Sequence, residues 1–315
     1  MKSQCNLPAF QTQFKVSIIG CGNVGATAAY AMLMDGTPSE IVLMDRSKEK
    51  AEGLMLDMEH SMAFLEYTKI VGTDDVRDCK NSQLIVVTAG ARQQEGETRL
   101  DLIKKNRAIF KELIPQLAKA APKAILLIVS NPVDVLTYEA YKLSGFPWGR
   151  VFGSGTLLDT ARLRFHLSQQ LCLNAKSVEA FILGEHGDTS FPVWSSANVA
   201  GMPLMKMEGF SKAMANAAYK DTREAAYRII HDLGYTCYSI STVIRELMTH
   251  IFQHSRVVLP LSVPLRGEYG IKDVALSVPC VLDSNGVAGI VEVPLNFLEK
   301  RQLKKSAATL KGYLR

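Results

Sequence analysis

The sequence predicts an α/β fold, with a doubly wound parallel sheet in the first half of its 315 residues and a mixed α+β domain in the second. Three observations support this prediction. Segments with strand and helix patterns alternate regularly up to about residue 150, which is typical of parallel sheets. An apolar run at 16–19 leads into glycines at 20–25 and then into a helical pattern. After residue 153 the alternation becomes irregular, so we expect a different architecture there.

In the first half, each element follows from hydrophobic periodicity and from the turn residues that bound it. We predict strands up to Gly20 and at 40–45, about 67–71, 83–88 and 124–130. We predict helices from the glycines to about Met34, from Lys48 to about Met62, from about Leu100 to Ala121, and after Pro132. The last of these cannot begin earlier, because the residue before a proline avoids the α conformation.

Three regions make up the predicted domain organisation. Residues 1–13 show no clear periodicity and would form an N-terminal arm, either disordered or packed on a neighbouring subunit. We place the first domain at 14–153 and the second at 154–315. In the second we expect a helix at about 156–170, a strand near 177–183, long helices at about 210–231 and 237–253, short antiparallel strands at about 256–291, and a closing helix at about 295–313.

The glycines indicate a dinucleotide site. In the pattern Gly-x-Gly-x-x-Gly, Gly20 would make a tight turn, Gly22 would let the backbone approach a pyrophosphate, and Gly25 would let the helix pack on the strand. Glycine turns also end strands that bind nothing, so context must decide. Asp45 supplies it, because it ends the next strand twenty residues after Gly25, where a carboxylate can bind two ribose hydroxyls. Since this carboxylate would repel a 2′-phosphate, we predict NAD rather than NADP, although Arg46 weakens the preference.

Composition and charge exclude several classes of protein. The net charge of +5 includes no long basic run, so nucleic-acid binding is not predicted. No apolar run reaches membrane-spanning length and no leader pattern follows Met1, so we expect neither membrane insertion nor export. The six cysteines are scattered without a CxxC pair, which favours reduced thiols in the cytoplasm and indicates no metal site.

Polar residues follow predicted strands at the edge where open α/β sheets bind ligands. Asn131 and the segment 88–99 lie there. In the second domain, Asp159 and Arg162 are three residues apart and share a helix face, although a surface ion pair is the commoner reason for that spacing. His186 stands between glycines after an apolar strand, which exposes its imidazole; a solvated loop histidine is the simpler explanation. Together with the glycine turn, these residues favour catalysis.

Several longer motifs connect the chain with a known family. They are GCGNVGATAAY, TAGARQQEGETRLDL, VSNPVDV, GSGTLLDTARLR, LGEHGDTSFPVWS and the turn Gly234-Tyr235-Thr236. In these motifs the chain resembles the L-lactate dehydrogenases of the lactate/malate dehydrogenase family over nearly its whole length. The resemblance implies a Rossmann-type NAD domain and reversible hydride transfer between NADH and pyruvate, giving L-lactate. The implied cofactor contacts are Gly20, Gly22, Asn23, Val24, Gly25, Asp45, Thr88, Ala89, Gly90 and Asn131.

The resemblance also implies a role for each polar residue of the cleft. His186 would be the acid/base, because an imidazole with an ordinary pKa of ~6.5 works in both directions near neutrality. Asp159 would orient the ring and favour its charged form, and Arg162 would hold the substrate carboxylate bidentately. Arg99 would polarise the carbonyl from a loop that closes over the site. The implied substrate contacts are Gln93, Arg99, Asn131, Arg162 and Thr236.

Two other functions stay open at this point. Malate dehydrogenases share the acid/base and both arginines, but they normally carry another arginine where this chain has Gln93, so a second substrate carboxylate would lack a partner. Because Arg92 is one residue earlier, malate or a broader set of L-2-hydroxy acids is the alternative. A non-catalytic binding protein on the same fold is the other, although all four catalytic positions hold the residue that the mechanism needs.

The resemblance also bears on assembly and regulation. Relatives are mostly tetramers built as pairs of dimers, so we expect a homotetramer. Many bacterial relatives are activated by fructose 1,6-bisphosphate, which bridges two subunits through one arginine and one histidine of each. Arg164 matches that arginine, but Glu179 occupies the histidine position, and a carboxylate there would repel a phosphate. We therefore predict no activation by this effector, with Glu179 either paired with Arg164 or simply solvated.

Overall fold

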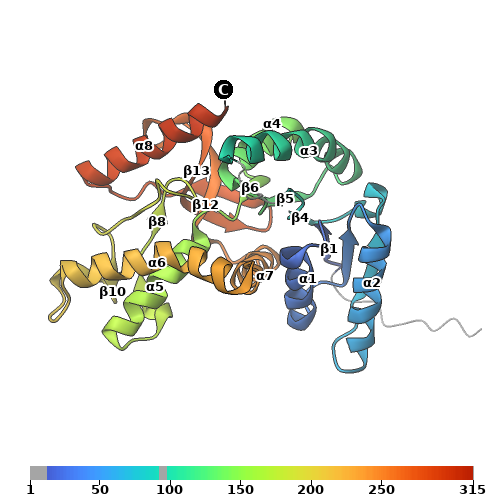
Figure 1. Ribbon diagram of the computed structural model, residues 1–315, viewed down its shortest axis with the longest axis horizontal. Coiled ribbons are helices and arrows are strands. Elements are labelled where there is room, and N and C mark those ends of the chain that lie inside the picture. Colours follow the sequence, from blue (N-terminus) through green and yellow to red (C-terminus); the bar gives the residue numbers. More distant parts are fainter. Residues whose placement is uncertain (1–12, 92–97, 315) are drawn as a thin grey trace, which may run out of the picture.

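The structure, a computed structural model, describes residues 13–91 and 98–314. Two sequence predictions therefore lie outside the described residues, namely the arm at 1–13, except its last residue, and Gln93. A nine-stranded sheet runs through the described part of the chain in the order β14-β13-β12-β6-β5-β4-β1-β2-β3, with helices on both of its faces (Figure 1). This arrangement confirms the predicted doubly wound α/β class.

Six strands of the sheet are parallel, and their order 3-2-1-4-5-6 is that of a dinucleotide-binding fold. Each strand is short and apolar, as expected for strands covered on both faces. They are β1 (Lys15–Ile19), β2 (Glu40–Met44), β3 (Lys69–Thr73), β4 (Leu84–Val87), β5 (Ile125–Ile128) and β6 (Val151–Gly153).

Two hydrophobic cores lie on opposite faces of these strands because successive side chains of a strand point to opposite sides. On β4, Leu84 and Val86 belong to one core, and Ile85 and Val87 belong to the other. The helices divide in the same way. The first core takes in α1 (Asn23–Asp35), α2 (Lys48–Glu59) and α7 (Tyr238–Phe252), whereas the second takes in α3 (Arg99–Ala120) and most of the buried face of α4 (Val133–Ser144).

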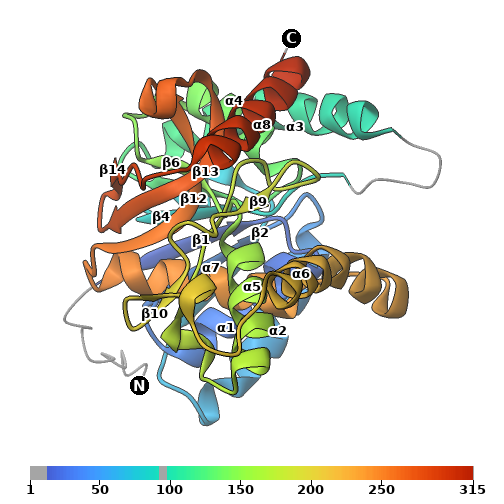
Figure 2. The same ribbon diagram turned by 90° about the vertical axis from the view of Figure 1, so that its left-hand side faces the viewer.

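A third, smaller core lies within residues 163–219. It joins α5 (Leu157–Leu171) and α6 (Lys212–Leu233), which lie side by side away from the sheet in Figures 1 and 2. Around them are five two-residue strands: β7 (Val178–Glu179), β8 (Ile182–Leu183), β9 (Phe191–Pro192), β10 (Asn198–Val199) and β11 (Met202–Pro203). The single strand predicted at 177–183 is therefore wrong, because β7 pairs with β10 and β8 with β9.

The antiparallel strands predicted at 256–291 exist, but two of them are long. They are β12 (Val257–Arg266), β13 (Lys272–Asp283) and β14 (Gly286–Ile290). Ser262 of β12 pairs with Gly153 of β6, so this hairpin continues the main sheet instead of forming a separate one. A side chain at Gly153 would crowd Ser262, with Cβ atoms 3.1 Å apart. The sheet thus runs across the boundary that we placed at residue 153.

The chain closes with α8 (Phe297–Leu314), which packs on β13. The cationic residues at 300, 301, 304 and 305 are all exposed on this helix. The predicted helix from Lys48 ends at Glu59, and a 3-10 turn (His60–Ala63) replaces its last residues. Of the helices described, none combines the length and the apolar character needed to cross a membrane.

Candidate active site

The glycine turn between β1 and α1 has the shape that a pyrophosphate needs. Gly20 has a φ of +97°, and a Cβ there would lie 2.7 Å from the backbone nitrogen of Ala89. A Cβ on Gly25 would overlap the carbonyl oxygen of Gly20. At Gly22, by contrast, no atom of the described residues other than its chain neighbours lies within 4 Å of that position. The turn is thus closely packed at Gly20 and Gly25 and open at Gly22. There the free N–H groups at the start of α1 can bind phosphate.

Asp45 lies beside this turn, as its place at the end of β2 predicts. Its Oδ2 accepts a hydrogen bond from the backbone N–H of Cys21 at 2.7 Å, and its Oδ1 accepts one from that of Ser47 at 3.2 Å. Two backbone donors therefore hold the carboxylate in a fixed orientation. Each oxygen keeps a lone pair for a ribose hydroxyl, so the chain's own residues fit the adenosine half of NAD.

The segment after β4 completes this side of the crevice. The Thr88 hydroxyl donates to the carbonyl oxygen of Gly20 at 2.7 Å, and Ala89 packs against the same glycine. Asn106 of α3, which the sequence analysis missed, is 1% exposed. It accepts from the N–H of Ala91 at 2.7 Å and donates to the carbonyl oxygen of Asn131 at 2.7 Å. This buried amide therefore ties together two of the strand ends that were expected to meet.

The loop that carries His186 is held by α5 and by the main sheet. Ile182 of β8 donates its N–H to the Thr160 hydroxyl at 2.9 Å and accepts at its carbonyl oxygen from Thr156 at 2.5 Å. Gly184 then exchanges two 3.0 Å backbone hydrogen bonds with Ser277 of β13. These contacts align the first turns of α5 with the loop. They explain how residues 27 positions apart come to face each other.

His186, Asp159 and Arg162 form one hydrogen-bonded cluster. The Nδ1 atom of His186 is 2.6 Å from Oδ2 of Asp159, and Nη1 of Arg162 is 3.2 Å from Oδ1 of the same carboxylate. The side chains of Asp159 and Arg162 are only 17% and 13% exposed, so they are not the plain surface pair that the spacing alone suggested. Among the described residues, no hydrogen bond uses Nε2 of His186, which leaves this nitrogen for a ligand.

The electrostatics of the cluster favour an imidazolium beside a carboxylate. Asp159 raises the pKa of His186 above its ordinary value, against the opposing effect of burial. Burial works against the charge of Asp159, but His186 and Arg162 outweigh it and hold the pKa of Asp159 below its ordinary value. The two directions agree, because each partner stabilises the charged form of the other.

A pocket of about 280 Å³ opens in front of this cluster. Its lining includes six of the residues predicted from sequence: Val24, Asn131, Asp159, Arg162, His186 and Thr236. Val24 belongs to the helix that follows the glycine turn, so the pocket adjoins the cofactor side of the crevice. Arg99 begins α3, but its side chain is not among those described, so the structure places neither it nor Gln93 in the pocket.

Sequence reasoning also missed residues that the structure brings to this pocket. Tyr219 and Arg223 line it from α6, and the Tyr219 hydroxyl donates to the carbonyl oxygen of Ser190 at 2.6 Å. Helical periodicity marks α6 as a helix with one buried face, but it gives no signal that residues along one side of this helix line the pocket that holds His186. Sequence reasoning also assigned no role to Asp134 of the motif VSNPVDV. This residue is buried and accepts a hydrogen bond from the backbone N–H of His186.

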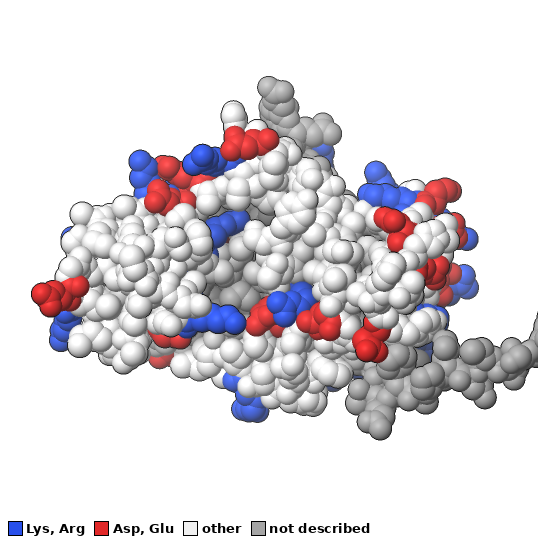
Figure 3. All heavy atoms as spheres, turned by 90° about the horizontal axis from the view of Figure 1, so that it is seen from below, with Lys and Arg blue, Asp and Glu red and all other residues white. Residues whose placement is uncertain are grey.

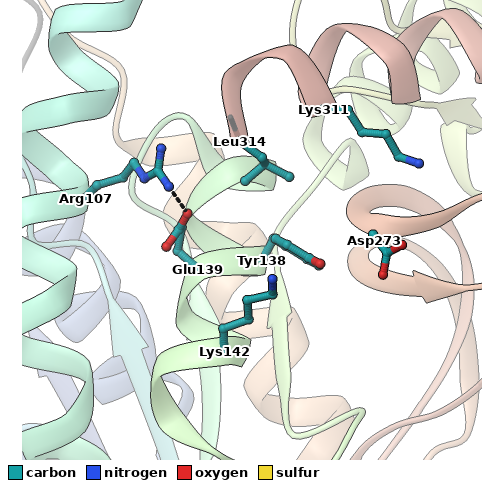
Figure 4. A pocket seen from close by; sticks show the side chains of 7 residues that line it. All are labelled: Arg107, Tyr138, Glu139, Lys142, Asp273, Lys311 and Leu314. Atoms are coloured by element: carbon teal, nitrogen blue, oxygen red, sulfur yellow. Dashed lines mark hydrogen bonds and ion pairs between the residues drawn. The ribbon is translucent and has the colours of Figure 1, made fainter.

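A second hollow, of about 550 Å³, lies away from this cluster between α4, α8 and the start of β13 (Figure 4). Arg107 pairs with Glu139 across it at 2.5 Å, and the Lys142 ammonium lies over the Tyr138 ring. None of the predicted site residues lines this hollow. Size alone therefore does not identify the active site, which is recognised by its chemistry.

Family models match both halves of the chain, and curated relatives match nearly its whole length. The model of the lactate/malate dehydrogenase NAD binding domain matches residues 14–153, and that of the family's alpha/beta C-terminal domain matches residues 156–315. An L-lactate dehydrogenase of Acetivibrio thermocellus is 43% identical over 306 residues, covering 96% of each chain. The L-lactate dehydrogenase B-A chain of Danio rerio is 45% identical, covering 97% of this chain and 93% of its own.

Solved structures agree as well. A lactate dehydrogenase from a Medee basin deep-sea metagenome library superposes with a TM-score of 0.92 at 42% identity. The minor L-lactate dehydrogenase of Enterococcus mundtii also gives 0.92, at 37% identity. Each comparison covers 96% of this chain and 98% of the other. The chain therefore belongs to the lactate/malate dehydrogenase family.

Proposed function

We propose that this chain is an NAD-dependent L-lactate dehydrogenase that interconverts pyruvate and L-lactate, with His186 as the acid/base. One observation carries the proposal: His186 is paired with Asp159, keeps Nε2 free of hydrogen bonds to the described residues, and shares its pocket with Arg162. A carbonyl acceptor needs a proton donor, and a 2-oxo acid needs a cation for its carboxylate. The pocket supplies both, next to the helix that follows the glycine turn.

The chain's own residues divide the work as follows. NADH, when bound, supplies the hydride that reaches the carbonyl carbon of pyruvate. Nε2 of His186 gives its proton to the carbonyl oxygen, while Asp159 holds Nδ1 and keeps the ring oriented. Arg162 has five N–H donors, so its contact with Asp159 leaves others for the substrate carboxylate. In the reverse direction, the neutral imidazole takes the proton from the lactate hydroxyl.

The remaining predicted residues have supporting roles in this proposal. Arg99 polarises the carbonyl from the start of α3, and Gln93 sets the chemistry at the far end of the substrate. Asn131 binds near the carbonyl oxygen and the nicotinamide, and Thr236 forms a wall of the pocket. The lining of the pocket by Asn131 and Thr236 supports the last two assignments.

A spectrophotometric assay tests the proposal directly. The purified protein is mixed with NADH and either pyruvate or oxaloacetate, and the absorbance of NADH is followed. We expect pyruvate to be reduced with a much higher kcat/KM than oxaloacetate, because Gln93 offers no charge to a second carboxylate. Equal values would indicate malate or broad 2-hydroxyacid specificity instead. Binding of NADH without oxidation would favour a non-catalytic role.

The pH dependence of the two directions is the first prediction. Pyruvate reduction needs the imidazolium. Its kcat/KM should therefore stay constant below the raised pKa of His186 and fall as the pH rises through that pKa. Lactate oxidation needs the neutral ring and should rise over the same range. Asp159→Asn removes the largest cause of the raised pKa. The fall in pyruvate reduction and the rise in lactate oxidation should therefore both move to lower pH. Stopped-flow rates between about pH 5 and 10, a range that covers the titration of perturbed imidazoles, would measure both pH profiles. Unchanged profiles in this variant would contradict the assignment.

Self-association is the second prediction. We propose a homotetramer in the cytoplasm. Exposed apolar side chains gather on α1, α6 and α7, among them Met34, Tyr227 and Tyr238, which are 52%, 71% and 67% exposed. In Figure 3 charged side chains are sparse over much of the face formed by the lower helices of Figure 1. Patches of this kind are typical of interfaces. Light scattering at micromolar concentration should give four times the mass of 34.7 kDa; a monomer would contradict the proposal.

The response to fructose 1,6-bisphosphate is the third prediction. The structure pairs Glu179 with Arg164 at 3.4 Å, the first of the two arrangements expected from sequence. Arg164 also donates to the carbonyl oxygen of Ala180 and lies over the Phe181 ring. This arginine is therefore already engaged, and a carboxylate faces any incoming phosphate. Pyruvate saturation should be close to hyperbolic and unaffected by the effector. A severalfold fall in the pyruvate KM at millimolar effector and neutral pH would contradict this.

A further inference from the structure

Asp134 is a carboxylate buried on the far side of the His186 loop. It lies in the first turn of α4 and is 2% exposed. Its Oδ2 accepts the backbone N–H of His186 at 2.7 Å, and its Oδ1 accepts the hydroxyl of Ser262 at 2.6 Å. Ser262 is itself fully buried in β12. One side chain thus links α4, the main sheet and the main chain of the proposed acid/base.

The charge of Asp134 is not needed to satisfy these hydrogen bonds. An amide of the same shape could accept from His186 and donate to the Ser262 hydroxyl, which can accept as well. A buried carboxylate is costly unless it is strongly compensated, and burial raises the pKa of Asp134 to about 6 against the effects of Ser262 and the His186 N–H. Asp134 is therefore still mostly ionised at neutral pH. The fold therefore keeps a negative charge next to the main chain of His186, although a neutral amide could make the same two hydrogen bonds.

Several other groups act on the same imidazole. Asp159 and Arg162 face it from α5, and they respectively favour and oppose its protonated form. Asp134 faces it from α4 and also favours that form. Glu185 adjoins it in its own loop, where its Oε2 accepts from Thr189 at 2.5 Å. The lining of the pocket adds Asp188 from the loop and Tyr219 and Arg223 from α6. Of these carboxylates, Asp159 and Asp134 raise the pKa of the imidazole, and they do so from different helices.

We propose that Asp134 is a positioning residue for the reaction, which fixes the main chain of His186 from behind and whose charge favours the protonated imidazole. This inference rests on the proposed function of His186. Asp134 is absent from the lining of the pocket, so it acts through His186 and touches no substrate. Asp159 would orient the ring, and Asp134 would hold the backbone from which that ring projects.

Asp134→Asn is the central test because it keeps the shape and both hydrogen bonds while it removes the charge. We expect the variant to fold and to bind NADH with a Kd within about twofold of the unmodified protein, since no contact of the glycine turn changes. The alkaline limb of pyruvate reduction should move to lower pH. The ratio of kcat/KM at pH 8 to that at pH 6 should fall roughly threefold or more, because a lost negative neighbour weakens the imidazolium. The KM for pyruvate should change less than kcat.

An NMR titration gives a readout that needs no catalysis. The imidazole signal of His186, assigned by its absence from His186→Asn, should titrate at lower pH in Asp134→Asn than in the unmodified protein. Glu299→Gln is the matched control. Glu299 is 4% exposed and accepts backbone N–H hydrogen bonds from Ser195 and from Asn296. Neither partner contacts His186, so this variant should lose stability without moving either the titration of His186 or the pH profile of pyruvate reduction.

Ser262→Ala keeps the test decisive if Asp134→Asn does not fold. It leaves the carboxylate and its bond to His186 in place but removes the hydroxyl that lowers the pKa of Asp134. A larger fraction of Asp134 is then neutral near pH 7. The alkaline fall in pyruvate reduction should therefore move to lower pH, as in Asp134→Asn, but by a smaller amount. A folded, active Asp134→Asn or Ser262→Ala protein with an unchanged limb and an unchanged His186 titration would overturn the inference alone. Absence of turnover by the unmodified protein would overturn the proposed function, and this inference with it.

Discussion

His186→Asn is expected to lower kcat for pyruvate reduction about 10²–10⁴-fold, the range that a positioned acid/base contributes, while NADH binding stays nearly unchanged. Asparagine can still contact Asp159, but it cannot carry the proton that the carbonyl oxygen needs. The Nδ1 to Oδ2 distance of 2.6 Å shows that the present pair is already aligned for this task. The absorbance of NADH measures kcat, and its fluorescence in a titration measures the Kd.

A matched control separates the loss of this imidazole from the loss of any histidine. The side chain of His231 is 88% exposed near the end of α6, where it pairs with its neighbour Asp232. His231→Asn should leave kcat and the Kd for NADH as they are. A parallel loss of NADH binding in His186→Asn would mean that this residue serves the cofactor or the fold, and that the acid/base is another group.

Gln93→Arg is expected to produce the second largest effect, a change of substrate preference from pyruvate toward oxaloacetate. Oxaloacetate carries a second carboxylate, and an unpaired charge buried at the far end of the substrate costs about 2–5 kcal/mol, or some 30- to several-thousandfold in affinity. An arginine at 93 would pair with that carboxylate, whereas the methyl group of pyruvate gains nothing from it. The ratio of kcat/KM for the two substrates should therefore narrow or reverse.

The sequence offers a control for this change one position further on. Gln94→Arg adds the same charge one residue away but should leave the preference for pyruvate intact, because the proposal assigns the contact with the far end of the substrate to residue 93 alone. Measuring both substrates with both variants distinguishes a specific partner from a general rise in positive charge. If Gln93→Arg left the ratio unchanged, Gln93 would have no contact with the substrate.

The local sequence was sufficient to predict the glycine turn and the elements around it. Gly20 has a φ of +97°, and a Cβ on Gly25 would overlap the carbonyl oxygen of Gly20, so both requirements arise within the turn itself. Strand and helix periodicities located five of the six parallel strands to within a few residues, because each of them is continuous and bounded by turn residues. They missed β6, which is only three residues long. Asp159 and Arg162 were likewise found on one helix face because that depends on helical spacing alone.

Other features were decided only by how distant segments pack. The length of β12 and β13 depends on their pairing with the sheet through Ser262 and Gly153, residues 109 positions apart in the numbering of the chain. Asn106 and Asp134 are polar residues inside helical patterns, which normally mark a solvated face. Their burial follows from hydrogen-bond donors and acceptors supplied by other elements, including Asn131 and His186. Periodicity tells which side of a helix is apolar, but only the tertiary structure shows which partner can satisfy a polar side chain away from water.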